Sequence, residues 1–282
     1  MSKLIELAKS DFIRIKPLVQ EFMHYLNIPA YLKGLGRGRI WVDDKSEPKS
    51  VVIWDLVNTF LFLAGDTGNQ LFNDGFKQLI NEVITPVFLE KKIDLMYFFP
   101  DSVAWEKQIP KIFDKKELTK RLIDHYIYNP DNFHQIKDWR NNLPLNLEMI
   151  QVTKKFLENN PLVNFGTVDY CISVVWQSAE RYLQDGIGFC LVDNDSIASW
   201  CTTDYVIDNN CEVYIETFEG FKKKGYASLV ASALIEESLR RNYVVHWHCW
   251  ETNIGSVKTA EKVGFEFKDK DVVLKMPLVM EK

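Results

Sequence analysis

The feature that most constrains the fold is a short basic loop, Lys222-Lys-Lys-Gly225, set between a β-rich run and a long helix-forming segment. The run Cys211–Thr217 has the residues of a strand. The segment Ala227–Arg241 consists of good helix formers with a wide apolar surface. A glycine between them lets the backbone turn tightly and leaves amide N–H groups unpaired at the helix N-terminus. This pattern predicts an anion cradle that suits a pyrophosphate, because the helix dipole adds positive potential.

Further strands and helices flank this unit in the second half of the chain. Apolar residues at helical spacing predict one longer helix from Val168 to Tyr182, with Gly186 in the position of a left-handed cap. Asn242 and Gly264 are expected to close two later helices. After a short run at 145–150, the expected order is α-α-β-β-β-α-β-α-β. Its helices lie at 153–159, 168–182, 227–241 and 254–263, and its strands at 188–192, 196–203, 211–217, 244–250 and 272–276.

The first half gives a similar order. Helices are expected at 12–26, 70–91 and 103–113, and strands at 38–42, 51–55, 59–64, 93–99 and 121–128. A polar, proline-marked stretch, Asn129–Pro144, separates the halves. With 282 residues the chain has room for two compact domains. We therefore predict two domains of related α/β fold, at residues 1–130 and 131–282.

Composition excludes several classes of protein. A hydrophobic content of 46% with 26% charged residues is ordinary for a globular protein, and a net charge of −5 disfavours nucleic acid and anionic lipid as partners. The N-terminus lacks the features of a secretory signal, and no apolar run approaches the ~18–20 residues of a membrane span. We expect no membrane association and a cytoplasmic location. The five cysteines lack C-x-x-C spacing, so reduced core thiols are expected.

The loop and the elements after it resemble the GNAT acetyltransferase family, whose loop reads Arg/Gln-x-x-Gly-x-Gly/Ala where this chain has Lys222-Lys-Lys-Gly225-Tyr-Ala227. The resemblance covers about Leu145–Met276. The features that fall where the family has them are the helix from Ala227, the strand Val244–Trp250, Asn253, Ser256 and Gly264-Phe265. Ile215-Glu-Thr217 and Cys249-Trp250-Glu-Thr-Asn253 look most like the zwittermicin A resistance type of acetyltransferase.

The resemblance implies a fold and an activity. The fold is α/β (α+β), with two tandem GNAT-like domains, each a mixed, mostly antiparallel sheet flanked by helices, the first lacking the acetyl-CoA loop. The activity is transfer of the acetyl group of acetyl-CoA to an amine of a small molecule, such as an antibiotic or aminopolyol, with the first half framing the acceptor cleft. A longer acyl chain is an open alternative. A non-catalytic acyl-CoA-binding or regulatory module is another alternative. It is favoured because Ala260 stands where the family often has a tyrosine that acts as the general acid.

The resemblance also implies the residues that hold acetyl-CoA. Thr217 and Phe218 would meet the pantetheine arm through their backbone, and Asn253 and Ser256 would contact it from the other side. Lys222 stands in place of the family's usual arginine. The residues implied around the pyrophosphate are Lys222, Lys223, Lys224, Gly225, Tyr226, Ala227 and Ser228.

Two glutamates on one expected strand are the candidates for proton transfer. Glu212 and Glu216 share one strand face by alternation, so either is a candidate general base, although exposed carboxylates often only solubilise a strand. His246 and His248 also share a face. With Cys249 they supply too few convergent ligands for zinc, so no metal is expected and we interpret them as packed or substrate-facing histidines.

Overall fold

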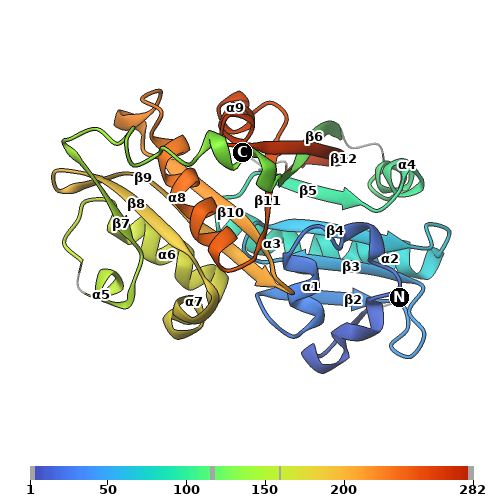
Figure 1. The fold of residues 1–282 in the computed structure, drawn as a ribbon. Helices are drawn as coiled ribbons and strands as arrows, with labels where there is room; N and C mark the ends of the chain where they lie inside the picture. The colour runs from blue at the N-terminus through green and yellow to red at the C-terminus, as the bar shows by residue number, and fades with distance from the viewer. Residues whose placement is uncertain (1–3, 115–117, 159, 279–282) are drawn as a thin grey trace. The chain divides into compact units, whose positions relative to one another are not determined.

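The computed structural model describes residues 4–114, 118–158 and 160–278 (Figure 1). By its internal contacts the chain forms two compact units, Met1–Leu122 with Asp271–Lys282 (unit 1) and Ile123–Lys270 (unit 2). Two strands, β6 (Thr119–Tyr128) and β12 (Phe265–Pro277), each contribute residues to both units. Among the described residues, no helix is both long and apolar enough to cross a membrane.

Unit 1 is a mixed sheet with the order β1-β2-β3-β4-β5-β12. All neighbouring strands are antiparallel except β4 and β5, which are parallel. Its strands besides the shared ones are β1 (Ile5–Glu6), β2 (Gly38–Val42), β3 (Ser50–Asp55), β4 (Phe60–Gly65) and β5 (Leu95–Pro100). Its helices are α1 (Asn27–Leu32), α2 (Gln70–Leu79), α3 (Thr85–Glu90) and α4 (Val103–Ile112).

The core of unit 1 is aromatic. Trp41, Trp54 and Trp105 are buried in one cluster. Leu274 and Met276 of β12 belong to the same cluster, although they stand near the end of the sequence. The last strand of the chain therefore completes the core of the first unit.

Two helices expected in unit 1 differ from prediction. The helix expected at 12–26 is wrong, because this region forms the 3₁₀ helices Lys9–Ile15 and Gln20–Phe22. Pro17 falls at the break and lacks the N–H that a continuing helix would use there. The helix expected at 70–91 forms, but a π-helical turn, Ile80–Ile84, separates α2 from α3. Pro86 follows this turn and lacks the N–H that a regular helix would use there.

Unit 2 is a second mixed sheet with the order β12-β6-β11-β10-β9-β8-β7. Its neighbours are antiparallel where their pairing is described, except for the parallel pair β10 and β11. Its remaining strands are β7 (Leu147–Gln151), β8 (Gly188–Asp193), β9 (Ser196–Ile207), β10 (Asn210–Thr217) and β11 (Val244–Trp250). Its helices are α5 (Lys154–Leu157), α6 (Phe165–Trp176), α7 (Ala179–Asp185), α8 (Tyr226–Arg240) and α9 (Ile254–Lys262).

The two units share a plan. In each, a series of antiparallel strands is followed by a strand–helix–strand unit whose two strands are parallel. This unit is β4, α2–α3 and β5 in unit 1, and β10, α8 and β11 in unit 2. The predicted fold class, two tandem mixed and mostly antiparallel sheets flanked by helices, is confirmed. In unit 2, α8 lies across the sheet and contacts β8, β9, β10 and β11 (Figure 1).

The helix expected from Val168 to Tyr182 is two helices. Gln177 takes a left-handed conformation with φ 64°, which ends α6, and the Ser178 side chain then caps α7 by accepting from the Arg181 amide. The left-handed cap expected at Gly186 is also wrong, because its φ is −72°. A glycine is needed there for another reason: a Cβ would lie 2.4 Å from the Tyr182 ring.

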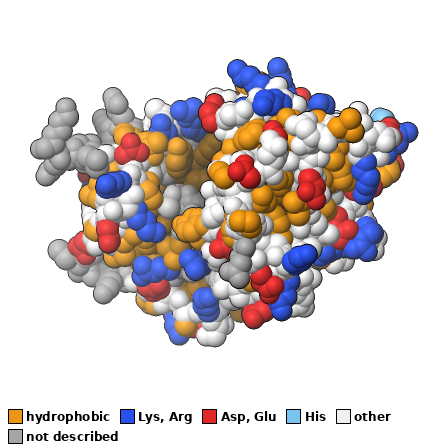
Figure 2. Space-filling model, turned by 90° about the vertical axis from the view of Figure 1, so that its left-hand side faces the viewer, with side chains coloured by type: hydrophobic (Ala, Val, Ile, Leu, Met, Phe, Trp, Pro, Cys, Tyr) orange, Lys and Arg blue, Asp and Glu red, His pale blue; other side chains and the backbone are white. Residues whose placement is uncertain are grey.

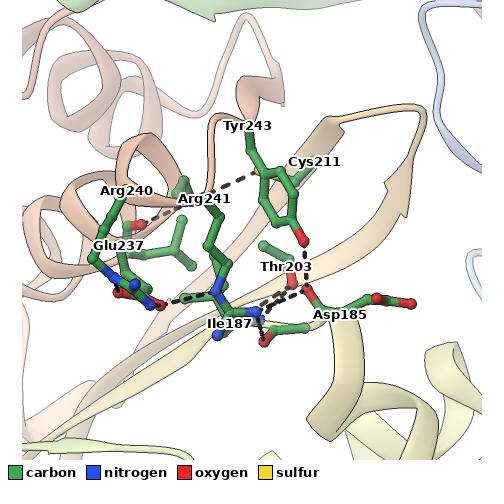
Figure 3. Close-up of polar contacts among 11 residues, drawn as sticks. Asp185, Ile187, Thr203, Cys211, Glu237, Arg240, Arg241 and Tyr243 are labelled. Carbon is green, nitrogen blue, oxygen red and sulfur yellow. Dashed lines mark hydrogen bonds and ion pairs between the residues drawn. The ribbon is translucent and has the colours of Figure 1, made fainter.

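The end of α7 is held by residues that follow α8 (Figure 3). Arg241 donates to the carbonyl oxygens of Asp185 at 3.4 Å and Gly186 at 3.3 Å. Tyr243 donates its hydroxyl to the same Asp185 oxygen at 3.4 Å. Helix C-termini leave carbonyls without intrahelical partners, so these side chains fix the end of α7 to the segment between α8 and β11. Asn242, with φ 58°, ends α8, and Gly264, with φ 102°, ends α9, both as predicted.

Candidate functional site

The parallel strands β10 and β11 separate partway along their length. They pair only over Asn210–Glu212 and Val244–His246, although β10 runs on to Thr217 and β11 to Trp250. A register shift on β10 against β9 lies at the same place, between Cys211 and Val213. Beyond Glu212 the facing strand edges therefore leave an opening in the sheet.

A pocket of about 550 Å³ lies beside this opening. Its walls come from the end of β10, the following loop, the first turn of α8, one residue of β11 and the start of α9. The residues that line it are Ile215, Glu216, Thr217, Phe221, Lys222, Lys223, Gly225, Tyr226, Ala227, Ser228, Trp247, Asn253, Gly255, Ser256 and Thr259. The structure thus gathers most of the residues implied for acetyl-CoA in one concave site.

The floor of the pocket is a row of backbone amides. Gly225 caps α8 in a left-handed conformation with φ 80°, and its carbonyl accepts from the Ser228 amide. Within the described chain, the amides from Lys223 to Ala227 have no hydrogen-bond partner. A Cβ built at Gly225 would meet nothing within 4 Å, so the space above these amides is open. Successive N–H groups at a helix N-terminus bind phosphate groups, so this cradle fits a pyrophosphate.

The three lysines of the loop differ in their surroundings. Lys222 forms an ion pair with Glu219 at 2.5 Å, so much of its charge is balanced within the loop. Lys224 lies over the rings of Phe221 and Tyr226, at 5.2 and 5.8 Å from their centroids. Lys224 also lines a second cavity of about 420 Å³, together with Lys262 of α9. Positive charge therefore lies on both sides of the cradle.

The opposite wall is built by the start of α9. The Asn253 side chain accepts from the Ser256 amide at 3.2 Å and caps this helix. The Ser256 hydroxyl in turn accepts from the buried Trp247 indole at 3.0 Å. Asn253 and Ser256 both line the pocket, and each also has a structural bond. Ala260 is fully buried and offers no acidic group.

Thr217 and Phe218 are placed differently from each other. Thr217 lines the pocket, and its hydroxyl lies 2.8 Å from the Ser199 hydroxyl. Phe218 is not among the lining residues. Its amide donates to the Ala198 carbonyl at 3.1 Å, and its carbonyl accepts from the Phe221 amide at 2.9 Å. The structure therefore brings Thr217, but not Phe218, to the pocket wall.

The two candidate glutamates also differ. Glu216 lines the pocket. The Glu212 carboxylate instead accepts from Nδ1 of His248 at 2.9 Å, across the point where the strands separate. The His248 ring stacks on that of His125 of β6, with centroids 4.4 Å apart and planes 8° apart. Glu212 thus forms an acid–imidazole pair, a partner that strand alternation did not predict.

Several residues of the site were missed by the sequence analysis. Trp247 and Thr259 line the main pocket and Lys262 the second cavity. Trp247 stands in a run whose pattern indicates only a buried strand. Thr259 and Lys262 come six and nine residues after Asn253 on the expected helix. This helical spacing is the signal that could have found them. His125 had no local signal, because its strand is remote in sequence.

The surface is mixed in charge. Figure 2 shows one face of the molecule, on which Lys and Arg side chains lie among Asp, Glu and hydrophobic side chains. This agrees with the small net charge of −5.

Comparison with known families gives a match over most of the chain. The profile of the family described as "GNAT acetyltransferase" matches residues 16–273. One curated relative, the "Uncharacterized N-acetyltransferase YdfB" of Bacillus subtilis (strain 168), is 24% identical over 266 residues, which cover 94% of this chain and 96% of the relative.

Solved structures share the fold. A GCN5-related N-acetyltransferase-like protein from Streptococcus suis 89/1591 superposes with a TM-score of 0.69 at 18% identity, covering 95% of this chain and 100% of the other. A GCN5-related N-acetyltransferase from Sphaerobacter thermophilus gives 0.59 at 10% identity, with 98% and 97% covered. A tandem GNAT protein from the clavulanic acid biosynthesis pathway gives 0.56 at 10% identity, with 99% of both chains covered.

Proposed function

Because the chain belongs to the GNAT acetyltransferase family and is an acyltransferase enzyme, we propose that it transfers the acetyl group of acetyl-CoA to an amine of a small molecule. The observation that carries the proposal is the row of amides from Lys223 to Ala227, which borders the pocket beside the separated strands β10 and β11. We assign acetyl-CoA binding to residues 131–282.

We assign residues 1–130 to a degenerate domain of the same kind, and the loop before α2 supports this. Its Asp66 side chain accepts from the Gly68 amide at 2.8 Å, and the Asn69 side chain accepts from the Phe72 amide at 3.1 Å. One of the amides before α2, that of Gly68, is thus occupied by a side chain. The parallel pairing of β4 with β5 also continues to Leu63 and Pro100, so these strands do not separate early.

The residues of the pocket support binding in one orientation. The cradle and Lys224 suit the phosphates of acetyl-CoA, which places the pantetheine arm between Thr217 and Asn253. Bound acetyl-CoA supplies a thioester carbonyl that an amine attacks. The pocket residues contribute by excluding water and fixing the distance between the reactants, which lowers the barrier without covalent catalysis. Glu216 lines the same pocket and is one candidate to receive the proton of the amine.

A cationic, polyhydroxylated amine is the acceptor class that we propose. Glu216 has an intermediate exposure at the pocket, and its carboxylate would attract a protonated amine. The segments Ile215-Glu-Thr217 and Cys249–Asn253, which look like the zwittermicin A resistance type, both border the opening between β10 and β11. An aminopolyol antibiotic fits these observations.

Two measurements test the proposal. The first is calorimetric titration with acetyl-CoA and with coenzyme A, for which we expect dissociation constants in the micromolar range, roughly −8 kcal/mol. The second is release of the coenzyme A thiol in the presence of kanamycin, glucosamine, spermidine or a peptide with a free N-terminus. Thiol release above hydrolysis with one of these amines supports an amine acetyltransferase. Absence of acetyl-CoA binding would contradict the assignment of the pocket.

A further inference from the structure

The second cavity, of about 420 Å³, adjoins the cradle on the side away from β10. Gly225 and Ser228 line both the main pocket and this cavity, so the amides at the start of α8 lie at the border between the two. The other walls of the second cavity are the next turn of α8, the end of α9 and the segment that joins β6 to β7. A ligand held at the cradle can therefore extend into two cavities.

The segment between β6 and β7, residues 129–146, is an anchored wall of the second cavity. Trp139 and Asn142 of this segment line the cavity. The Trp139 indole donates a hydrogen bond to the Glu236 carboxylate of α8 at 3.0 Å, and Arg140 forms an ion pair with the same carboxylate at 2.7 Å. The guanidinium of Arg140 also lies over the Trp139 ring, 4.3 Å from its centroid. The wall is thus fixed to α8 by the protein's own side chains.

The charge at the second cavity is positive. Lys224 and Lys262 line it, and both side chains belong to exposed residues. The described residues that line the cavity include no aspartate or glutamate, and neither lysine has an ion-pair partner within the described part of the chain. Lys222 of the same loop, in contrast, is paired with Glu219. Two unpaired cations at the wall of a cavity favour an anionic ligand there.

The remaining lining residues suit a ring with polar edges. Leu229, Pro144 and Val263 give the cavity an apolar surface, and the amides of Gln135 and Asn142 can each donate and accept hydrogen bonds. The volume falls within the range of roughly 300–1,000 Å³ that is typical of small-molecule sites. An adenine base has flat apolar faces and an edge of hydrogen-bond donors and acceptors. A phosphorylated adenosine therefore matches both the lining and the charge of this cavity.

The order of the groups in coenzyme A agrees with the order of the cavities. Its pyrophosphate joins a pantetheine arm on one side to an adenosine with a 3′-phosphate on the other. The proposed function assigns the pantetheine arm to the main pocket, between Thr217 and Asn253, and the pyrophosphate to the cradle. The adenosine must continue from the other end of the pyrophosphate, and the second cavity meets the cradle at Gly225 and Ser228.

We propose that the second cavity binds the 3′-phosphorylated adenosine of the donor and that Lys262 binds its 3′-phosphate. This inference rests on the proposed function and adds a selectivity to it, because the protein then prefers donors that carry the 3′-phosphate. An ammonium group and a phosphate form a charge-assisted hydrogen bond, which is stronger than one between neutral groups. The segment between β6 and β7 thereby takes part in donor binding, although it precedes the cradle by about 80 residues.

Calorimetric titration of the full chain with coenzyme A and with 3′-dephospho-coenzyme A tests the proposal without an acceptor. We expect the wild type to bind coenzyme A about tenfold more tightly, the effect of one charge-assisted contact. Lys262→Gln should lose about tenfold in affinity for coenzyme A and less than about twofold for 3′-dephospho-coenzyme A. Lys258→Gln is the matched control. It removes the same charge from an exposed position of α9 outside both cavities and should keep the preference of the wild type.

Asn142→Asp tests the wall formed by the segment between β6 and β7. A carboxylate at this position would repel the 3′-phosphate, so we expect about fivefold weaker binding of coenzyme A and a smaller loss for 3′-dephospho-coenzyme A. Asn141→Asp is the control, because Asn141 is also exposed but does not line the cavity. It should leave both affinities unchanged.

The titrations also separate two levels of failure. If neither nucleotide binds the wild type, the proposed function fails, and this inference fails with it. If both bind the wild type equally tightly, or if Lys262→Gln weakens both to the same extent, Lys262 does not bind the 3′-phosphate. This inference is then overturned, while the assignment of the main pocket to acetyl-CoA stands.

Discussion

The indole nitrogen of Trp247 donates a hydrogen bond to the hydroxyl of Ser256 at 3.0 Å, which joins β11 to the first turn of α9. Trp247 is 1% exposed. An alanine at position 256 would leave a buried N–H group without an acceptor, so we expect Ser256→Ala to lower the free energy of unfolding by about 1–3 kcal/mol. Urea denaturation measures this. Thr259→Ala is the control, because the hydrogen bond described for the Thr259 hydroxyl is to a carbonyl of its own helix, that of Gly255. An equal loss in the two variants would contradict the role of the indole bond.

Gly225→Asp should abolish acetyl-CoA binding, because a negative charge would stand over the amides of the cradle. We expect at least a 100-fold loss of affinity in calorimetry, equivalent to about 2.7 kcal/mol. Gly225→Ala separates the effect of the added charge from that of backbone strain. An alanine in this left-handed conformation costs about 1–2 kcal/mol of stability but adds no charge. Gly220→Asp is the control. Gly220 is exposed in the same loop, and a Cβ there also meets nothing within 4 Å. Equal affinity of Gly225→Asp and the wild type would remove the loop from the binding site.

Arg241→Lys should destabilise the fold more than Arg240→Lys, although both arginines bond to Glu237 (Figure 3). The Arg241 side chain is 24% exposed and also binds two carbonyls at the end of α7, whereas that of Arg240 is 71% exposed. A lysine cannot reproduce the forked geometry of Arg241. We expect a loss of about 1.5–3 kcal/mol for Arg241→Lys and less than about 1 kcal/mol for Arg240→Lys in urea denaturation. The reverse order would be incompatible with a structural role for the Arg241 bonds.

Stability should fall as the pH rises above neutral. Burial raises the pKa of the Cys211 thiol to about 12, and burial with nearby negative groups raises the pKa of the Tyr214 phenol to about 12. In the unfolded chain these groups lose their protons at about 8.5 and 10. Their contribution to stability is complete below those values and is lost as the pH rises toward 12. Urea denaturation at pH 7, 8.5 and 10 should show a decline that begins above pH 8. A constant free energy of unfolding up to pH 10 would refute this linkage.

Part of the fold followed directly from the sequence. The order of elements from Gly188 to Val263 is local, because each strand or helix carries its own periodicity and its own turn residue. The cradle was predictable for the same reason, since Gly225 lies between a clear strand and a clear helix. The free state of all five cysteines also agrees with the prediction from their spacing.

The rest depends on tertiary contacts or on single residues with weak propensity. The break at Gln177 needs a left-handed glutamine, which no pattern predicts, and Ser178 could be recognised as a cap only after that break was known. The contact of Glu212 with His248 joins residues 36 positions apart, and that of His125 with Asp269 joins residues 144 apart. Strand alternation gives the face of a side chain but not its partner.

The shared strands affect the order in which the protein can fold during synthesis. The sheet of unit 1 includes Leu274–Pro277, paired with Leu95–Phe98, and its core includes Met276. A ribosome that has translated the whole first half has therefore not yet made all the residues of the first unit. Until Leu274–Pro277 are synthesised, β5 exposes one edge and part of an apolar core, which is the kind of surface that chaperones bind. Emergence of β12, rather than of the first half of the chain, is the step that lets unit 1 close.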